Sequence, residues 1–288
     1  MSYAPLAFVT SLPAGRTDGR RGLARKLVLA SLLAATAACS PTIQSGGLVD
    51  PDAGSPQNIA SLTDVVQSNP NDAAALNVRG TAYARAGRND QAIADFTRAI
   101  QINPNQREAY ANRALVLRRQ NNLPAALADY NRAVEIDPSY QQAYIGRGDV
   151  YRINNQLQLA INDYNRALEI SGDPQAYHSR GLTYQAQGQH QLAVNDFSSA
   201  ISLDAGTPEP FNARGQSRLT LGDPDKALED FNQAVIIDEN YYQAWSNRGA
   251  AYAALGDRVK AQGSFQRALT INPGYQPAKQ GMRGIRSL

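Results

Sequence analysis

The side chains that could act as nucleophile, general base or metal ligand are few in this sequence. It contains one cysteine, Cys39, and two histidines, His178 and His190. No HExxH, GxSxG, P-loop or EF-hand pattern accompanies them. A lone cysteine also excludes an internal disulfide and a cysteine-based zinc site. We therefore predict that the chain is not an enzyme and that it holds no metal and no cofactor.

Cys39 ends an N-terminal segment with the pattern of an export signal. Arg25 and Lys26 precede an uncharged stretch over residues 27–38, and Cys39 follows directly. Basic residues, a short apolar run and small residues before the cleavage point are typical of a secretory signal peptide. The stretch is shorter than the roughly 20 apolar residues that span a bilayer. The sequence therefore predicts a signal peptide over residues 1–38.

The residues at this cleavage point, Thr36-Ala37-Ala38-Cys39, resemble the lipobox of bacterial lipoproteins. In that family the cysteine is acylated and becomes the mature N-terminus, which implies lipidation of Cys39. Thr36 stands where the family usually has leucine, so ordinary cleavage with a free thiol at Cys39 is the alternative. By the sorting rule of the family, Ser40 implies an outer membrane location facing the periplasm. Residues 39–56 are rich in Gly, Ser, Pro and Asp and are predicted to form a flexible tether.

The formal charge of +3 is placed unevenly along the chain. Residues 1–38 hold five basic groups and one acidic group, which leaves 23 basic and 24 acidic groups from residue 39 onward. The mature chain has no basic excess that would attract a phosphate backbone. We predict no nucleic-acid partner, and contact with the membrane through the lipid anchor only.

A repeat of 33 or 34 residues fills the remainder of the chain. Arg-Gly recurs at 79–80, 147–148, 180–181, 214–215 and 248–249, with Arg113-Ala114 between the first two. With the small residue as position 8, positions 20 and 27 are alanine and position 24 is aromatic in all six units. This pattern is similar to the tetratricopeptide repeat (TPR). The resemblance implies helical hairpins stacked into a solenoid that binds proteins or peptides in a concave groove.

The periodicity agrees with that fold. Positions 4, 8 and 11 share one face of a first helix, and positions 20, 24 and 27 share one face of a second. Position 15 is always Gly or Asn, which best tolerate the left-handed conformation that ends a helix. We predict an all-α solenoid of six hairpins between two capping helices. The expected parts are a capping helix over 57–72, units over 73–106, 107–140, 141–173, 174–207, 208–241 and 242–275, and a second capping helix over 276–288.

Two sets of polar residues stand out from the repeat. Position 7 is always arginine, and position 23 is aspartate in five units but Ser264 in the sixth. Because these positions lie on facing helices, we predict five structural ion pairs. They are Arg79 with Asp95, Arg113 with Asp129, Arg147 with Asp163, Arg180 with Asp196, and Arg214 with Asp230.

The second set is the predicted partner groove. In TPR proteins positions 2, 5, 9, 12 and 13 of the first helices line the concave face. The resemblance therefore implies a groove lined by Asn77, Arg85, Arg118, Arg119, Asp149, Arg152, His178, Gln185, Asn212 and Gln216. Four of these are arginines in the first three units, and only Asp149 offsets them. An acidic segment or a carboxylate terminus suits such a cluster, and a solvated helix face without a ligand is the alternative.

Taken together, these features indicate a non-catalytic protein-binding scaffold or adaptor anchored in the bacterial envelope. The chain resembles the NlpI-type outer-membrane TPR lipoproteins, which implies a role in presenting envelope proteins to a periplasmic protease or hydrolase. An assembly factor for a pilus or secretion complex is the first alternative, and a peptidoglycan-associated binding module is the second. The sequence is also compatible with a homodimer and does not determine the oligomeric state.

The lipid anchor gives a direct test. Each methylene of an acyl chain contributes about 0.8 kcal/mol to membrane binding. Cys39→Ala is therefore expected to move the protein from the membrane fraction to the soluble periplasm, as followed by fractionation and immunoblotting. Retention of the variant in the outer membrane at high salt would contradict the lipoprotein assignment.

Overall fold

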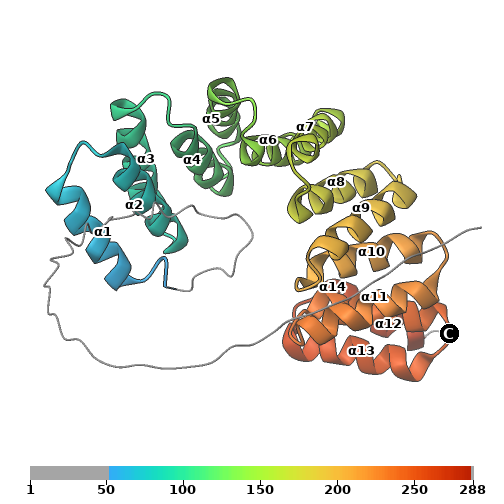
Figure 1. Ribbon diagram of the computed structural model, residues 1–288. Helices are drawn as coiled ribbons and strands as arrows, with labels where there is room; N and C mark the ends of the chain where they lie inside the picture. The colour runs from blue at the N-terminus through green and yellow to red at the C-terminus, as the bar shows by residue number, and fades with distance from the viewer. Residues whose placement is uncertain (1–51, 287–288) are drawn as a thin grey trace, which may run out of the picture. The chain divides into compact units, whose positions relative to one another are not determined.

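A computed structural model describes residues 52–286, and in that part of the chain every regular element is an α-helix (Figure 1). Residues 1–38, Cys39 and most of the predicted tether lie outside the described residues. The helices are α1 (Pro56–Ser68), α2 (Ala73–Arg85), α3 (Asn89–Ile102), α4 (Arg107–Arg119), α5 (Leu123–Ile136), α6 (Gln141–Ile153), α7 (Leu157–Ile170), α8 (Pro174–Ala186), α9 (His190–Leu203), α10 (Pro208–Thr220), α11 (Pro224–Ile237), α12 (Tyr242–Ala254), α13 (Arg258–Ile271) and α14 (Gln276–Arg286).

Each repeat is a helical hairpin closed by a short turn. The first helices of repeats 1–6 are α2, α4, α6, α8, α10 and α12, and the second helices are α3, α5, α7, α9, α11 and α13. Position 15 in each turn has a positive φ, between 58° at Asn155 and 83° at Gly222. Only Gly and Asn adopt this conformation readily, so the Gly/Asn pattern fixes where each first helix ends.

The two helices of a hairpin approach closely because an aromatic ring lies against a glycine. A Cβ added to Gly215 would lie 2.6 Å from Cε1 of Phe231, which is fully buried. The same contact joins Gly148 to Tyr164. Repeat 2 has Ala114 at this position, and a Cβ at Gly146 of the next repeat would lie 2.3 Å from Cζ of Tyr130. Small residues under the rings therefore set the spacing between helices.

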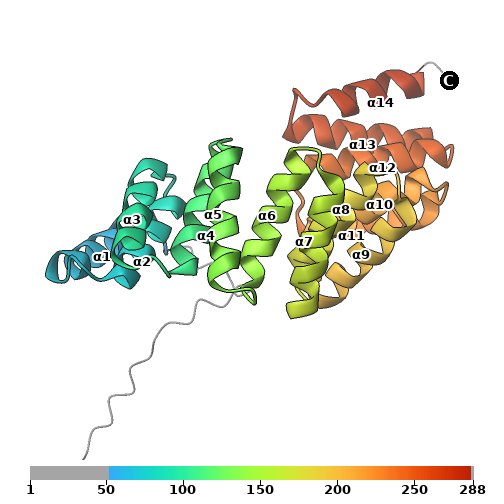
Figure 2. The same cartoon turned by 90° about the horizontal axis from the view of Figure 1, so that it is seen from above.

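Consecutive hairpins stack through both helices. Each second helix packs against the first helix of the next repeat, and successive first helices also contact one another. Second helices of different repeats do not contact one another within residues 52–286. The first helices thus form the inner row of the array and the second helices the outer row, and both views show the hairpins in chain order (Figures 1 and 2).

Single helices cover both ends of the array. Ile59 and Val66 of α1 are buried against the first repeat, with Ile59 in the cluster around Phe96. At the other end α14 buries Ala278 and packs Met282 against the cluster around Phe265. The predicted all-α solenoid of six hairpins between two capping helices is therefore confirmed. Helix α1 begins at Pro56, and Ser55 caps it by accepting a hydrogen bond from the Asn58 N–H.

The contact between glycine and ring generates a stability prediction. Gly215→Ala is expected to lower the free energy of unfolding by about 1–3 kcal/mol because the new methyl overlaps the Phe231 ring. Gly263→Ala on α13 is the control, since a Cβ there meets nothing within 4 Å, and it should gain about 0.5–1 kcal/mol. Urea unfolding followed by circular dichroism measures both. Equal midpoints for the two variants would show that this contact does not set the helix spacing.

Candidate functional site

The five predicted arginine–aspartate pairs are all formed. In repeat 1, Nε and Nη2 of Arg79 donate to the two carboxylate oxygens of Asp95, each at 2.7 Å. Repeats 2–5 form the same pair, with a shortest distance of 2.7 or 2.8 Å. The aspartate side chains are only 2–10% exposed and the arginines 15–20%. These are charge-assisted hydrogen bonds in a poorly hydrated site, which are stronger than exposed ion pairs.

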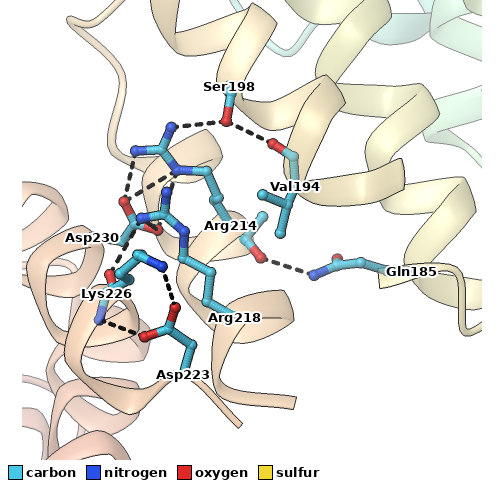
Figure 3. A network of polar contacts seen from close by, with 9 residues as sticks. Gln185, Val194, Ser198, Arg214, Arg218, Asp223, Lys226 and Asp230 are labelled. Carbon is cyan, nitrogen blue, oxygen red and sulfur yellow. Dashed lines mark hydrogen bonds and ion pairs between the residues drawn. The ribbon is translucent and has the colours of Figure 1, made fainter. Parts of the chain in front are cut away.

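In repeats 2–5 the arginine of the pair also ties its repeat to the one before it. Nη1 of Arg113 donates to Thr97 Oγ1 at 2.9 Å, and Thr97 lies on the second helix of the preceding repeat. Arg214 does the same with Ser198 at 3.0 Å (Figure 3). In repeat 5 a second arginine, Arg218, lies 2.9 Å from Asp230, whose pKa is raised by burial. We call the position-7 arginines and their aspartates the ladder. The ladder side chains are largely buried where neighbouring hairpins pack together.

The predicted groove lies on the inner row, and its centre is a charged cluster that spans repeats 2–4. Arg118 of α4 forms an ion pair with Asp149 of α6. Arg152 is 4.0 Å from the same carboxylate, and the Tyr164 hydroxyl donates to Asp149 Oδ1 at 2.8 Å. The Asp149 side chain is 7% exposed and that of Arg118 is 18% exposed. Asp149, the one acid predicted to offset these arginines, therefore compensates Arg118 directly, because stacking of α4 on α6 brings the two groups together.

His178 of α8 lies at the edge of this cluster. Its ring is 5.7 Å from that of Phe197 and tilted against it. Burial, and next the positive charge of Arg152, lowers the pKa of His178 to about 4. The imidazole is consequently neutral near pH 7. The second histidine, His190, begins α9 on the outer row.

Other predicted groove residues bridge neighbouring first helices. Asn77 accepts a hydrogen bond from Asn112 Nδ2 at 3.0 Å, and Asn212 accepts one from Asn247 Nδ2 at 2.8 Å. Both acceptors are buried. Gln185 Nε2 donates to the Ala213 carbonyl and to Ser217 Oγ, each at 2.8 Å. These amides lie between successive helices of the inner row and hold consecutive repeats in register.

The remaining predicted residues, Arg85, Arg119 and Gln216, are exposed. Within the described part of the chain, Arg85 and Arg119 form no ion pair. These two arginines end the first helices of adjacent repeats, α2 and α4, which contact one another. They are exposed cations of the inner row that a partner can reach without breaking an existing ion pair.

Four residues that the sequence analysis did not name form hydrogen bonds with predicted groove residues, namely Asn112, Asn247, Ser217 and Tyr164. A signal existed for Tyr164, since position 24 is phenylalanine in four repeats and tyrosine only here and at Tyr130. A hydroxyl at an otherwise apolar core position indicates a buried polar partner. Its partner, Asp149, follows only from the packing of the helices.

The described helices hold neither a cluster of metal-ligating side chains nor a membrane span. Residues 52–286 contain no group of three His, Cys, Asp or Glu side chains placed to hold a metal ion. None of the helices described is both long and apolar enough to cross a bilayer.

Family models identify the repeats. Models described as "Tetratricopeptide repeat" match residues 59–107, 86–141, 174–207, 208–241 and 242–275, and one described as "TPR repeat" matches residues 148–188. The hairpin geometry and these matches, which together cover most of the chain, define a helical repeat protein of the solenoid class. The chain belongs to the tetratricopeptide-repeat family.

Solved structures share this fold. A chain of the APC/C hetero-tetramer Cut9–Hcn1 has a TM-score of 0.73 and 17% identity, over 81% of this chain and 46% of that one. This chain thus spans less than half the length of that relative. YrrB, described as a TPR protein with an unusual peptide-binding site, has a TM-score of 0.54 and 28% identity over 65% of this chain and 97% of its own. A search of curated protein sequences found no match.

PilW, described as a widely conserved type IV pilus biogenesis factor, is also similar in structure. Its TM-score is 0.67 at 17% identity, over 72% of this chain and 97% of its own. PilF of Pseudomonas aeruginosa has a TM-score of 0.65 at 14% identity, over 80% of this chain and 99% of its own. At these identities the likeness shows the fold alone.

The lowered pKa of His178 predicts a pH dependence of stability. The folded state binds the proton less tightly than the unfolded state, whose histidine has a pKa near 6.5. The stabilising effect of a neutral His178 is complete above pH 6.5 and is lost as the pH falls toward 4, by about 2–3 kcal/mol. His178→Gln should flatten the unfolding free energy across this window, measured by urea titration at several pH values. His190→Gln is the control, and an equal slope in wild type and His178→Gln would refute the assignment.

Proposed function

We propose that this TPR protein is a non-catalytic adaptor of the bacterial cell envelope that binds an extended acidic segment of other proteins along the inner helices of repeats 1–3. The observation that supports this most is the pair of exposed, unpaired arginines, Arg85 and Arg119, on the contacting helices α2 and α4. Guanidinium groups that are displayed on a rigid surface suit the carboxylates of an acidic peptide.

The charge of the neighbouring cluster adds to this surface. Arg118 and Arg152 share one carboxylate, that of Asp149, while His178 stays neutral because burial lowers its pKa to about 4. The cluster therefore carries a net positive charge beside the two exposed arginines. A peptide-binding site is described for YrrB, which is similar to 65% of this chain, and this supports a peptide as the ligand.

The proposed location rests on the sequence of the N-terminal segment. Lipidation of Cys39 would place the adaptor at the outer membrane facing the periplasm, in a role like that of the NlpI-type lipoproteins, which present envelope proteins to a protease or hydrolase. The alternative role in assembling a pilus or secretion complex uses the same fold, as the pilus biogenesis factor PilW illustrates. The groove proposed here would serve either role.

Charge reversal tests the groove. The double variant Arg85→Glu/Arg119→Glu is chosen because neither side chain has an ion pair to break, whereas reversal at Arg118 would place a second carboxylate beside Asp149. We expect it to weaken binding of a fluorescein-labelled hexaglutamate peptide at least tenfold, about 1.4 kcal/mol, in fluorescence anisotropy at low salt. The melting temperature should stay unchanged.

Arg88→Glu/Arg98→Glu is the matched control, because both side chains are exposed in the same repeat and lie at the start of α3 or on it. It makes the same change of charge on the outer row and should bind the peptide within about twofold of wild type. Rising salt should weaken wild-type binding, since exposed charges are screened over about 8–10 Å. Equal losses in the two double variants would mean that only net charge matters and that no groove exists at repeats 1–3.

A further inference from the structure

Repeat 6 keeps the arginine of the ladder but lacks its carboxylate. Ser264 occupies the position that is aspartate in the five preceding repeats, and it is 1% exposed. Nε of Arg248 donates to Ser264 Oγ at 3.2 Å, the one hydrogen bond of this guanidinium in the described structure. A serine hydroxyl offers one neutral acceptor where a carboxylate offers two charged oxygens. The guanidinium of Arg248 thus has no charged acceptor among the described residues.

A second arginine of the same repeat has also lost its acidic partner. In repeats 2 and 3, Arg132 and Arg166 pair with a glutamate three residues later, at 3.2 and 3.0 Å. The equivalent arginine in repeat 6 is Arg267, and the residue three positions later is Thr270. Within the described residues Arg267 has no ion pair. Both acidic partners are missing from this repeat while both arginines are retained.

The two arginines meet at one aromatic ring. Trp245 is the single tryptophan of the chain. The Arg248 guanidinium lies 4.4 Å from its ring centroid, and that of Arg267 lies 5.9 Å away. Glu239 contacts this cluster through its backbone carbonyl, which accepts a hydrogen bond from Trp245 Nε1 at 2.9 Å. The result is two cations on one ring, with no carboxylate paired to either.

The electrostatics of Arg248 differ from those of the other ladder arginines. Burial lowers its pKa, and only the nearby Tyr252 acts in the opposite direction. The pKa of Arg79, Arg113 or Arg180 is raised instead, chiefly by the hydrogen bond to its aspartate. A half-buried cation without a counter-ion is costly, so an arriving anion would relieve that cost.

We propose that Arg248 and Arg267, whose guanidinium groups both lie over the Trp245 ring, bind a carboxylate of a partner polypeptide at repeat 6. A carboxylate is the ligand favoured because five equivalent arginines in this chain already hold one, with Nε and Nη2 donating in parallel in repeats 1–4. With Ser264 in place of aspartate, repeat 6 lacks the internal carboxylate but keeps the guanidinium donors of Arg248. Tryptophan and arginine are also the residues that most often dominate the binding energy of protein interfaces.

This site is separate from the groove proposed at repeats 1–3 and can be tested independently of it. Because Trp245 is the only tryptophan, its fluorescence reports on repeat 6 alone. The probes are acetyl-hexaglutamate amide and the uncharged acetyl-hexaglutamine amide at low salt. We expect saturable quenching or a spectral shift with the acidic peptide and none with the uncharged one. A pentaalanine peptide with a free C-terminal carboxylate, compared with its amide, shows whether a terminus also binds.

The decisive variant is Ser264→Asp, which supplies the internal carboxylate that the other repeats have. It should weaken the acidic peptide's effect on Trp245 at least tenfold while the protein remains folded, as checked by circular dichroism. Gln266→Asp is the matched control, because it adds the same charge to α13 at an exposed position, and it should bind within about threefold of wild type. Arg267→Gln should also weaken binding of the acidic peptide, and this variant adds no carboxylate beside Arg248.

Three results would overturn the proposal. One is equal binding of the acidic peptide by wild type and by Ser264→Asp. Another is an equal loss in Ser264→Asp and Gln266→Asp, which would indicate a general charge effect. The third is tighter binding of inorganic phosphate than of the acidic peptide at matched ionic strength. The Arg85→Glu/Arg119→Glu variant should keep the full Trp245 response, so that failure of the groove and failure of this site are distinguishable.

Discussion

The close approach of two helices under an aromatic ring is the constraint on which the rest of this structure depends. In repeat 5 the ring of Phe231 lies where a Cβ on Gly215 would have to be, and the glycine allows the helices to meet. Arg214 directly precedes this glycine, and Asp230 directly precedes the phenylalanine. The close spacing of the helices therefore places the arginine opposite the aspartate. The polar ladder therefore follows from apolar packing, since a wider hairpin would separate Arg214 from Asp230.

The ladder in turn connects neighbouring repeats. An arginine that holds its own aspartate with two nitrogens has a third nitrogen for the preceding repeat, as Arg113 shows with Thr97. A solenoid has only nearest-neighbour contacts between its units, so such bridges specify the stacking at each junction. Their partial burial also explains why the serine in repeat 6 matters, because an arginine kept in that environment without its carboxylate is electrostatically unsatisfied.

Two separate surfaces follow from this arrangement. The inner row presents exposed arginines at the start of the array, beside a cluster in which Asp149 already compensates Arg118. The hairpin of repeat 6 presents arginines whose acidic partners are missing. Both surfaces are proposed here to bind acidic polypeptides, and two such sites on one array would let it hold a single extended partner, or two different ones. This is the property that an adaptor requires.

The sequence by itself determined the repeat register, the hairpin turns and the pairing of Arg79 with Asp95. Each of these features depends only on residues within one 34-residue unit. Position 15 illustrates this, since a position occupied only by Gly or Asn, the residues that best tolerate a positive φ, indicates a left-handed turn, and all six residues there have a positive φ. Contacts between repeats were decided only by the tertiary structure. Arg118 and Asp149 are 31 residues apart and meet only because α4 stacks on α6. A pattern within one repeat says nothing of the angle between repeats, and that angle determines which charges are already neutralised and which remain for a partner.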